Sequence, residues 1–275
     1  MPEGDTIHKT ARRLRDALAG HRVVRFEMRR DPHGVRAPKP GTTIETIHAR
    51  GKHLLMTFDD GATLHTHMQM TGAWHTYRPG EKWRRAAHRA RVIIEVDTEA
   101  TAVCFDAPVV ELTRSGRVSA ATRAKRALER LGPDLATSDV DLDVVMLNLE
   151  RVDPEAEIGT VLLDQRVAGG IGNVFKSEIL WRERVDPFTP IGAIDAETRR
   201  RLYERAHTFI VANLQTRRRV TFQGGYAVYR KAKRLCPRCR TPIRMLRQGD
   251  PPRSTYWCPV CQPVTDGVSS PLREA

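Results

Sequence analysis

The sequence has no long apolar run and a deficit of acidic residues. No stretch of its 275 residues reaches the roughly 18 consecutive apolar residues that a membrane-spanning helix needs. The opening residues, MPEGDTIHKTARRLR, also lack the apolar core of a secretion signal. We therefore expect no membrane partner and a cytoplasmic, nucleoid-associated location. The 40% share of hydrophobic residues still supplies a core, which excludes a mostly disordered chain.

The deficit of acidic residues leaves a large positive charge. The chain has 46 Lys and Arg against 33 Asp and Glu, a formal net charge of +13. A field of this size favours a polyanionic partner, most often nucleic acid, although solubility or an arginine-rich genome would produce the same excess. The positions of the basic residues favour nucleic acid, because residues 217–219 are three arginines in a row and residues 230–234 run directly into the first cysteine pair.

Cysteine is scarce, yet four of the five cysteines form two C-x-x-C pairs separated by eighteen residues: Cys236, Cys239, Cys258 and Cys261. Four thiolates at this spacing suit tetrahedral zinc, and a site with no open position predicts one structural ion. Two disulfides or a redox pair are the alternatives, which a reducing compartment and the absence of a nearby βαβ pattern disfavour. Residues 248–251 read as a turn between strands at 243–246 and 254–257, which predicts a zinc-bound β-hairpin. Cys104 lies in an apolar run and reads as a buried thiol.

The N-terminal half has the pattern of one helix followed by short strands. Apolar residues on one stripe predict a helix over residues 5–19, which Gly20 ends. Alternating or β-branched runs predict strands at 23–28, 43–48, 53–58, 62–68, 91–96 and 109–112. Asp60-Gly61 joins two of them as a hairpin signal. This even spacing favours a sandwich or barrel.

Beyond residue 113 the period becomes helical. Residues 114–135 form a predicted linker, and helices are expected near 138–150, 156–167, 173–183 and 196–216. The predicted fold class is α+β: an N-terminal β-sandwich with a leading helix (1–113), a helical domain (136–225), a zinc hairpin (226–265) and a tail (266–275).

Residues 162–173, LLDQRVAGGIGN, place three glycines and an asparagine between two helical patterns. Asn173 can cap the second helix, whose N-terminal amides suit a phosphate. The spacing does not fit a dinucleotide fingerprint, because a helix precedes it and the glycines are not spaced G-x-G-x-x-G. Taken alone, the segment is equally well explained as an ordinary helical hairpin.

Four separated motifs occur in one order: Met-Pro-Glu-Gly at the N-terminus, Gly51-Lys52-His53 after a strand, LLDQ…GGIGN, and Tyr-Trp-Cys-Pro-Val-Cys. Together they resemble the formamidopyrimidine-DNA glycosylase and endonuclease VIII family of base-excision repair enzymes. The resemblance covers nearly the whole chain. It implies a two-domain DNA glycosylase/AP lyase with a helix-two-turn-helix domain and a zinc hairpin, acting on damaged duplex DNA, and we expect a monomer.

The N-terminus can supply the chemistry. Removal of Met1 would leave Pro2 as a secondary amine, and an α-amino group titrates at about 7.7 to 8.0 against about 10.4 for Lys, so part of it is a free nucleophile near neutral pH. Glu3 is placed to protonate the sugar oxygen. Without the other motifs, Pro2 would read as a stiff helix start and Glu3 as a favourable first-turn anion.

The resemblance assigns further roles. Pro2 would attack C1′ and form a Schiff base that undergoes β- and then δ-elimination. Lys52 matches a phosphate-contacting lysine that assists β-elimination, and Arg253 matches the hairpin arginine that assists δ-elimination. Otherwise these two are an exposed loop lysine and one more surface charge. Asn173 and Arg130 match DNA-contacting positions, and Gln69, Met70 and Thr71 stand where the family carries the wedge that fills the gap left by a flipped base.

Two further interpretations concern specificity and metal binding. Gln69-Met70-Thr71 is similar to the contiguous Gln-Leu-Tyr of the endonuclease VIII branch, as is the Tyr-Trp-Cys-Pro hairpin end, so we expect oxidised pyrimidines to be preferred. The alternatives are an 8-oxoguanine/formamidopyrimidine glycosylase and a DNA-binding protein without catalysis. His65 and His67 alternate on one strand near His48 and His53; satisfied strand histidines are favoured over a second metal site.

Overall fold

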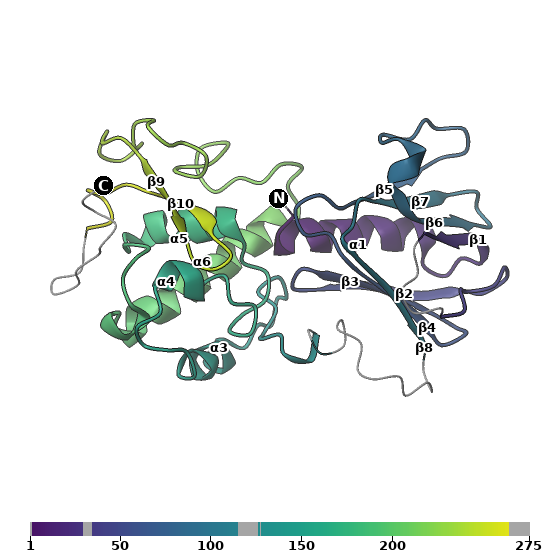
Figure 1. Ribbon diagram of the computed structural model, residues 1–275, viewed down its shortest axis with the longest axis horizontal. Helices are drawn as coiled ribbons and strands as arrows, with labels where there is room; N and C mark the ends of the chain where they lie inside the picture. The colour runs from purple at the N-terminus through teal and green to yellow at the C-terminus, as the bar shows by residue number, and fades with distance from the viewer. Residues whose placement is uncertain (1, 30–34, 115–125, 127, 264–275) are drawn as a thin grey trace. The chain divides into compact units, whose positions relative to one another are not determined.

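The computed structural model describes residues 2–29, 35–114, 126 and 128–263 (Figure 1). The chain divides into two units, Met1–Arg130 and Leu131–Ala275, a division that falls inside the predicted linker. Most of that linker and the predicted tail lie outside the described residues, as does Met1. Within the described residues no helix is long and apolar enough to cross a bilayer.

The first unit is a β-sandwich with a leading helix, as predicted. Helix α1 (Gly4–Leu18) is followed by β1 (Val23–Met28), β2 (Ile44–Arg50), β3 (His53–Phe58), β4 (Ala62–His67), β5 (Ala73–Tyr77), the short 3₁₀ helix η1 (Ala87–Arg89), β6 (Ala90–Val96), β7 (Thr101–Phe105) and β8 (Val109–Arg114). The strands form two antiparallel sheets, ordered β1-β6-β7-β5 and β2-β3-β4-β8. Figure 1 shows α1 running alongside these two layers.

The sandwich core forms because each element buries one apolar face. Ile7, Ala11, Leu14 and Leu18 recur at helical spacing on α1 and are all buried. They join the inward side chains of both sheets in one cluster, so truncating Leu14 to alanine would cost about 2–5 kcal/mol. Cys104 is fully buried in this cluster, and burial raises the pKa of its thiol.

Two strands of this unit are absent from the sequence prediction. In β7, residues 102–105 are all buried, because the inner face meets the sandwich core while the outer face packs with Tyr77 and Trp83 in a second cluster. A strand covered on both faces shows no alternation. Strand β5 mixes small, polar and aromatic residues, and its pairing partner is β7. The connection between β3 and β4 spans residues 59–61, as the predicted strand bounds imply, and it contains the Asp60-Gly61 pair.

The second unit is helical and ends in a two-stranded hairpin. It contains α3 (Leu142–Leu149), α4 (Ile158–Val161), α5 (Asn173–Glu183), the 3₁₀ helix η2 (Ile191–Ala193), α6 (Ala196–Asn213), β9 (Arg244–Gln248) and β10 (Arg253–Trp257). The predicted helix over 156–167 was wrong in length. After α4 the chain makes tight turns, in which the amides of Leu163, Asp164 and Val167 each bond a carbonyl three residues back. These turns join α4 to α5 as a helix-two-turn-helix.

Three histidines pack on the outer face of the β2-β3-β4-β8 sheet. His53 pairs across the strands with His67, and the His53 Nδ1 and His65 Nε2 atoms are 2.8 Å apart in a hydrogen bond between stacked rings. Burial lowers the pKa of His53 to about 3 and those of His65 and His67 to about 4, and neighbouring positive charge adds to the effect. The bond between His53 and His65 and the lack of a metal-binding arrangement at these described histidines favour strand residues over a second metal site. They are not fully satisfied, since the buried His65 Nδ1 has no hydrogen-bond partner.

This cluster predicts acid sensitivity. The folded pKa lies below the unfolded value of about 6.5, so the unfolded state binds more protons and stability falls as the pH drops below about 6.5. Between pH 7 and pH 5, one such histidine lowers the free energy of unfolding by about 2 kcal/mol. His65→Asn should therefore lose less stability over this interval than the wild type in thermal unfolding, whereas the exposed control His88→Asn should lose as much. Equal losses in all three proteins would contradict the assignment.

Candidate functional site

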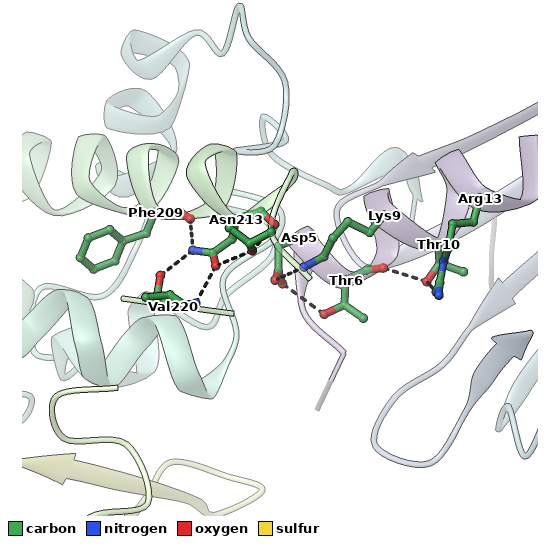
Figure 2. A network of polar contacts seen from close by, with 9 residues as sticks. Asp5, Thr6, Lys9, Thr10, Arg13, Phe209, Asn213 and Val220 are labelled. Atoms are coloured by element: carbon green, nitrogen blue, oxygen red, sulfur yellow. Dashed lines mark hydrogen bonds and ion pairs between the residues drawn. The ribbon is translucent and has the colours of Figure 1, made fainter. Parts of the chain in front are cut away.

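The N-terminal residues are held by the first turn of α1. Pro2 is half-buried, and Glu3, the residue before the helix, is fully buried with extended backbone. The Glu3 carbonyl accepts hydrogen bonds from the amides of Thr6 (2.9 Å) and Ile7 (3.1 Å). Figure 2 shows that Asp5, also buried, lies 3.4 Å from the Lys9 ammonium and accepts a 3.2 Å bond from the Thr6 hydroxyl. Pro2 and the buried Glu3 are thus consecutive residues at the start of α1, where the helix backbone holds Glu3.

Lys52 lies in the two-residue turn that joins β2 to β3. Arg50 pairs with His53 across this turn, and Gly51 has a φ of 57°, a left-handed conformation that glycine adopts at little cost. The Lys52 side chain is half-buried next to the histidine cluster. Arg130, the last residue of the first unit, is exposed.

The loop carrying Gln69, Met70 and Thr71 is exposed but firmly anchored. Thr71 donates to the Asp106 carbonyl (3.0 Å), and its own carbonyl accepts from Arg85 (2.8 Å). A Cβ on Gly72 would lie 2.7 Å from Met68 backbone atoms, so only glycine fits there. The Met70 side chain is 56% exposed, an unusual position for a large apolar group, and it projects from a backbone that cannot easily move.

The glycine-rich turn before α5 is held by Gln165. Its Nε2 donates to the carbonyls of Leu163 (2.8 Å) and Ile171 (3.1 Å), and its Oε1 accepts from the Gly170 amide. The expectation that Asn173 caps the next helix was wrong. Gly172, with extended backbone, is the N-cap, and Asn173 is the first helical residue. The Asn173 side chain binds the hairpin, because its Nδ2 donates to the Ser254 carbonyl at 2.5 Å. The buried Asn173 Oδ1 has no hydrogen-bond partner.

The four paired cysteines form one cluster. Their sulfur atoms all lie within 4.8 Å of one another, with Cys236 to Cys261 at 3.8 Å and Cys239 to Cys258 at 3.3 Å. Tetrahedral zinc, about 2.3 Å from each sulfur, separates the sulfurs by about 3.8 Å, so the donor set fits that ion. Among the described residues no other group of three or more His, Cys, Asp or Glu side chains is arranged to hold a metal. The zinc is structural, since four thiolates leave no open position.

Arg253 is the first residue of β10 and is exposed. Its cross-strand partner is Gln248, which is buried and belongs to β9, so the predicted turn at 248–251 is shifted to 249–252. Ser254, the next residue, carries the carbonyl that binds Asn173. Within this unit, therefore, the Asn173 bond holds the start of β10 against the N-terminus of α5. The dipole of that helix end and the Arg253 guanidinium both favour an anion.

Sequence analysis did not identify two buried side chains, the carboxylate of Glu178 and the amide of Asn213, that hold the loop before the zinc site. Glu178 on α5 accepts bonds from the Thr221 hydroxyl and from the amides of residues 227–229, at 2.6 to 2.8 Å. Asn213, shown in Figure 2, bonds both the amide and the carbonyl of Val220. A polar residue in a helical pattern reads as surface, so no local signal could reveal these long-range partners.

The zinc site predicts a metal-dependent hairpin. In Cys258→Ser the bound zinc should fall from one per chain to near none, and the hairpin should open because its folding is linked to metal binding. Trypsin cleavage after the exposed Arg244, Arg247 and Arg253 should then accelerate by about tenfold or more. Cys104→Ala, which removes a thiol outside the site, should keep its zinc. Unchanged cleavage in verified zinc-free protein would contradict the prediction.

Sequence models of known domains match almost the whole chain. The formamidopyrimidine-DNA glycosylase N-terminal domain matches residues 1–127, the formamidopyrimidine-DNA glycosylase H2TH domain matches 131–222, and a zinc finger found in FPG and IleRS matches 235–264. These three matches follow the order of the sandwich, the helix-two-turn-helix and the zinc hairpin.

Individual proteins agree with these matches. The chain is 40% identical to probable endonuclease 8 2 of Streptomyces coelicolor, over 95% of this chain and 94% of that protein. It is 34% identical to DNA-(apurinic or apyrimidinic site) lyase Nei2 of Mycolicibacterium smegmatis, over 95% and 99%. A solved complex of Lactococcus lactis Fpg with DNA containing N7-benzyl-Fapy-dG shares the fold, with a TM-score of 0.77 at 20% identity over 95% and 99%. The chain belongs to the formamidopyrimidine-DNA glycosylase and endonuclease VIII family of DNA glycosylase/AP lyases.

Proposed function

We propose that this protein excises oxidised bases, preferentially pyrimidines, from duplex DNA through a Schiff base at Pro2, followed by β,δ-elimination. The observation that carries the proposal is the N-terminus, where Pro2 precedes a fully buried Glu3 on a rigid helix start. Removal of Met1 makes the Pro2 nitrogen a secondary amine. The same nitrogen would be an inert amide in a chain that retains Met1.

Each step has a residue suited to it. The Pro2 nitrogen attacks C1′, the glycosidic bond breaks and the base leaves, while Glu3 protonates the sugar oxygen as the ring opens. The resulting iminium makes the C2′ protons acidic, so loss of one forms a C2′–C3′ double bond and expels the 3′ phosphate. The conjugated iminium then makes the C4′ proton acidic, and its loss expels the 5′ phosphate from C5′. Lys52 assists the first elimination and Arg253 the second. The zinc ion takes no part in these steps; it folds the hairpin that carries Arg253.

DNA binding follows from groups that attract phosphate. In the second unit, the N-terminus of α5, which begins at Asn173, and the adjoining Arg253 form an anion site, and Arg130 adds a charge at the end of the first unit. Solved structures of the Lactococcus lactis relative contain DNA with an abasic site, which supports damaged DNA as the partner here too. We assign catalysis to residues 1–113, DNA binding to 136–225 and 226–265, and expect a monomer.

The wedge loop bears on specificity. Met70, exposed on an anchored loop, can fill the gap that a flipped nucleotide leaves in the duplex. Thr71 offers no ring to stack, and its hydroxyl already bonds the Asp106 carbonyl. An apolar plug without an aromatic neighbour holds the opposite base weakly, which favours broad tolerance of that base.

Borohydride trapping tests the Schiff base. Reduction of the iminium on an abasic-site duplex should leave a covalent protein-DNA adduct, and peptide mapping should place it on the peptide that begins with Pro2. A matched protein extended at the N-terminus, in which the Pro2 nitrogen is an amide, should give no adduct. The lack of an adduct from correctly processed protein would sink the proposed enzyme and favour a DNA-binding protein without catalysis.

Excision kinetics test the lesion preference. On duplexes of matched sequence, thymine glycol should be removed several-fold faster than 8-oxoguanine opposite cytosine, since a pocket discriminates related bases by about 1–3 kcal/mol. Changing the base opposite thymine glycol should alter its rate little. A clear preference for 8-oxoguanine would instead assign the protein to the 8-oxoguanine/formamidopyrimidine specificity.

A further inference from the structure

Lys176 is a fully buried cation in the second turn of the site helix, α5. A buried ammonium group is unfavourable unless hydrogen bonds replace its lost water. The Lys176 Nζ donates to the Thr255 hydroxyl of β10 at 2.7 Å, and Thr255 is also fully buried. This contact joins two residues 79 positions apart in the sequence.

The hydrogen bonds continue beyond Thr255 in one direction. The Thr255 hydroxyl, which accepts from Lys176, donates to Gln248 Oε1 on β9 at 2.8 Å. Gln248 Nε2 then donates to Glu157 Oε2 and to the Pro187 carbonyl, each at 2.8 Å. The chain thus runs from a cation to a carboxylate and links α5, both strands of the hairpin and the residue before α4.

Packing around Gln248 leaves little freedom. A Cβ on Gly159 of α4 would lie 2.3 Å from Gln248 Oε1, so the side-chain amide rests directly on the helix backbone. A residue in such a position cannot shift without breaking its bonds. The chain of Lys176, Thr255 and Gln248 is therefore a fixed element of the second unit.

The hydrogen bonds of Lys176, Thr255 and Gln248 flank Arg253 but do not involve its side chain. Gln248 is the cross-strand partner of Arg253, and Thr255 lies two residues along β10, on the same face of the strand. One turn before Lys176 on α5, Asn173 holds the Ser254 carbonyl. The buried bonds therefore fix residues 254 and 255 and the partner of residue 253, while the Arg253 side chain itself stays exposed.

We propose that Lys176 is a positioning residue for the second elimination: through Thr255 and Gln248 it holds the start of β10, so that Arg253 stays beside Asn173 and the N-terminus of α5. The inference rests on the proposed function, in which Arg253 assists loss of the 5′ phosphate. The folding of the hairpin rests on zinc, so loss of the Lys176 bond affects where Arg253 stands more than whether the hairpin forms.

Single-turnover reactions of full-length, zinc-loaded protein on an abasic duplex test this role. The ratio of δ- to β-elimination product should fall about tenfold in Lys176→Met and in Thr255→Val, the effect of one lost hydrogen bond to a charged group. Thr255→Ser, which keeps the hydroxyl, should retain the wild-type ratio, as should Lys39→Met at an exposed lysine of the first unit. Because Lys176 and Thr255 act in one chain, the double variant should be no worse than the poorer single one. Borohydride trapping and zinc content should stay near wild type.

Three results would overturn the inference. Wild-type product ratios in Lys176→Met and Thr255→Val would show that Arg253 needs no such support. An equal fall in Thr255→Ser and Thr255→Val would remove the hydroxyl from the argument. A loss of zinc or of thermal stability with an unchanged product ratio would show that the Lys176–Thr255–Gln248 hydrogen bonds serve folding and not the second elimination. Absence of a trapped adduct from the wild type would instead defeat the proposed function itself.

Discussion

The zinc hairpin cannot hold itself together, and the second unit is organised around that constraint. Two strands of five residues are marginal alone in water, so their shape depends on metal and on helix α5. The helix touches the hairpin at three levels: Asn173 on Ser254, Lys176 on Thr255, and Trp181, whose indole nitrogen lies 3.4 Å from the Cys236 sulfur. The metal holds the end of the hairpin near Cys236 and Cys258, while α5 holds the strand residues Ser254 and Thr255.

A similar arrangement recurs in the first unit, where exposed functional groups stand on backbone that cannot move. Met70 projects from a loop held by Arg85 and by Thr71, and the Asp106 turn that anchors this loop is itself ion-paired to Arg85 and Arg89 at 2.5 and 2.8 Å. In both units an exposed side chain proposed to meet DNA, Met70 or Arg253, stands on backbone that buried or paired polar groups hold in place. Such preorganisation lowers the entropy cost of binding.

Local patterns in the sequence predict much of this structure, and long-range contacts account for the rest. The stripe on α1, the strands β1 and β3, helix α5 and the four cysteines follow from periodicity or spacing within a few residues. Strand β7 was not predicted, because both its faces are covered and its sequence shows no alternation. The role of Asn173 was predicted wrongly, because its hydrogen-bond partner lies 81 residues away. Lys176 gives no signal at all, since a lysine in a helix normally reads as solvated surface.

Amide hydrogen exchange across the hairpin tests the central claim most directly, because it reports local opening residue by residue. The account predicts that zinc-loaded Thr255→Val exchanges faster than wild type at Gln248 and Arg253, while the amides around Cys236 and Cys258 keep their protection. Two results would contradict the claim that the metal and helix α5 hold different parts of the hairpin. One is unchanged exchange at Gln248 and Arg253, and the other is a uniform rise across the whole hairpin.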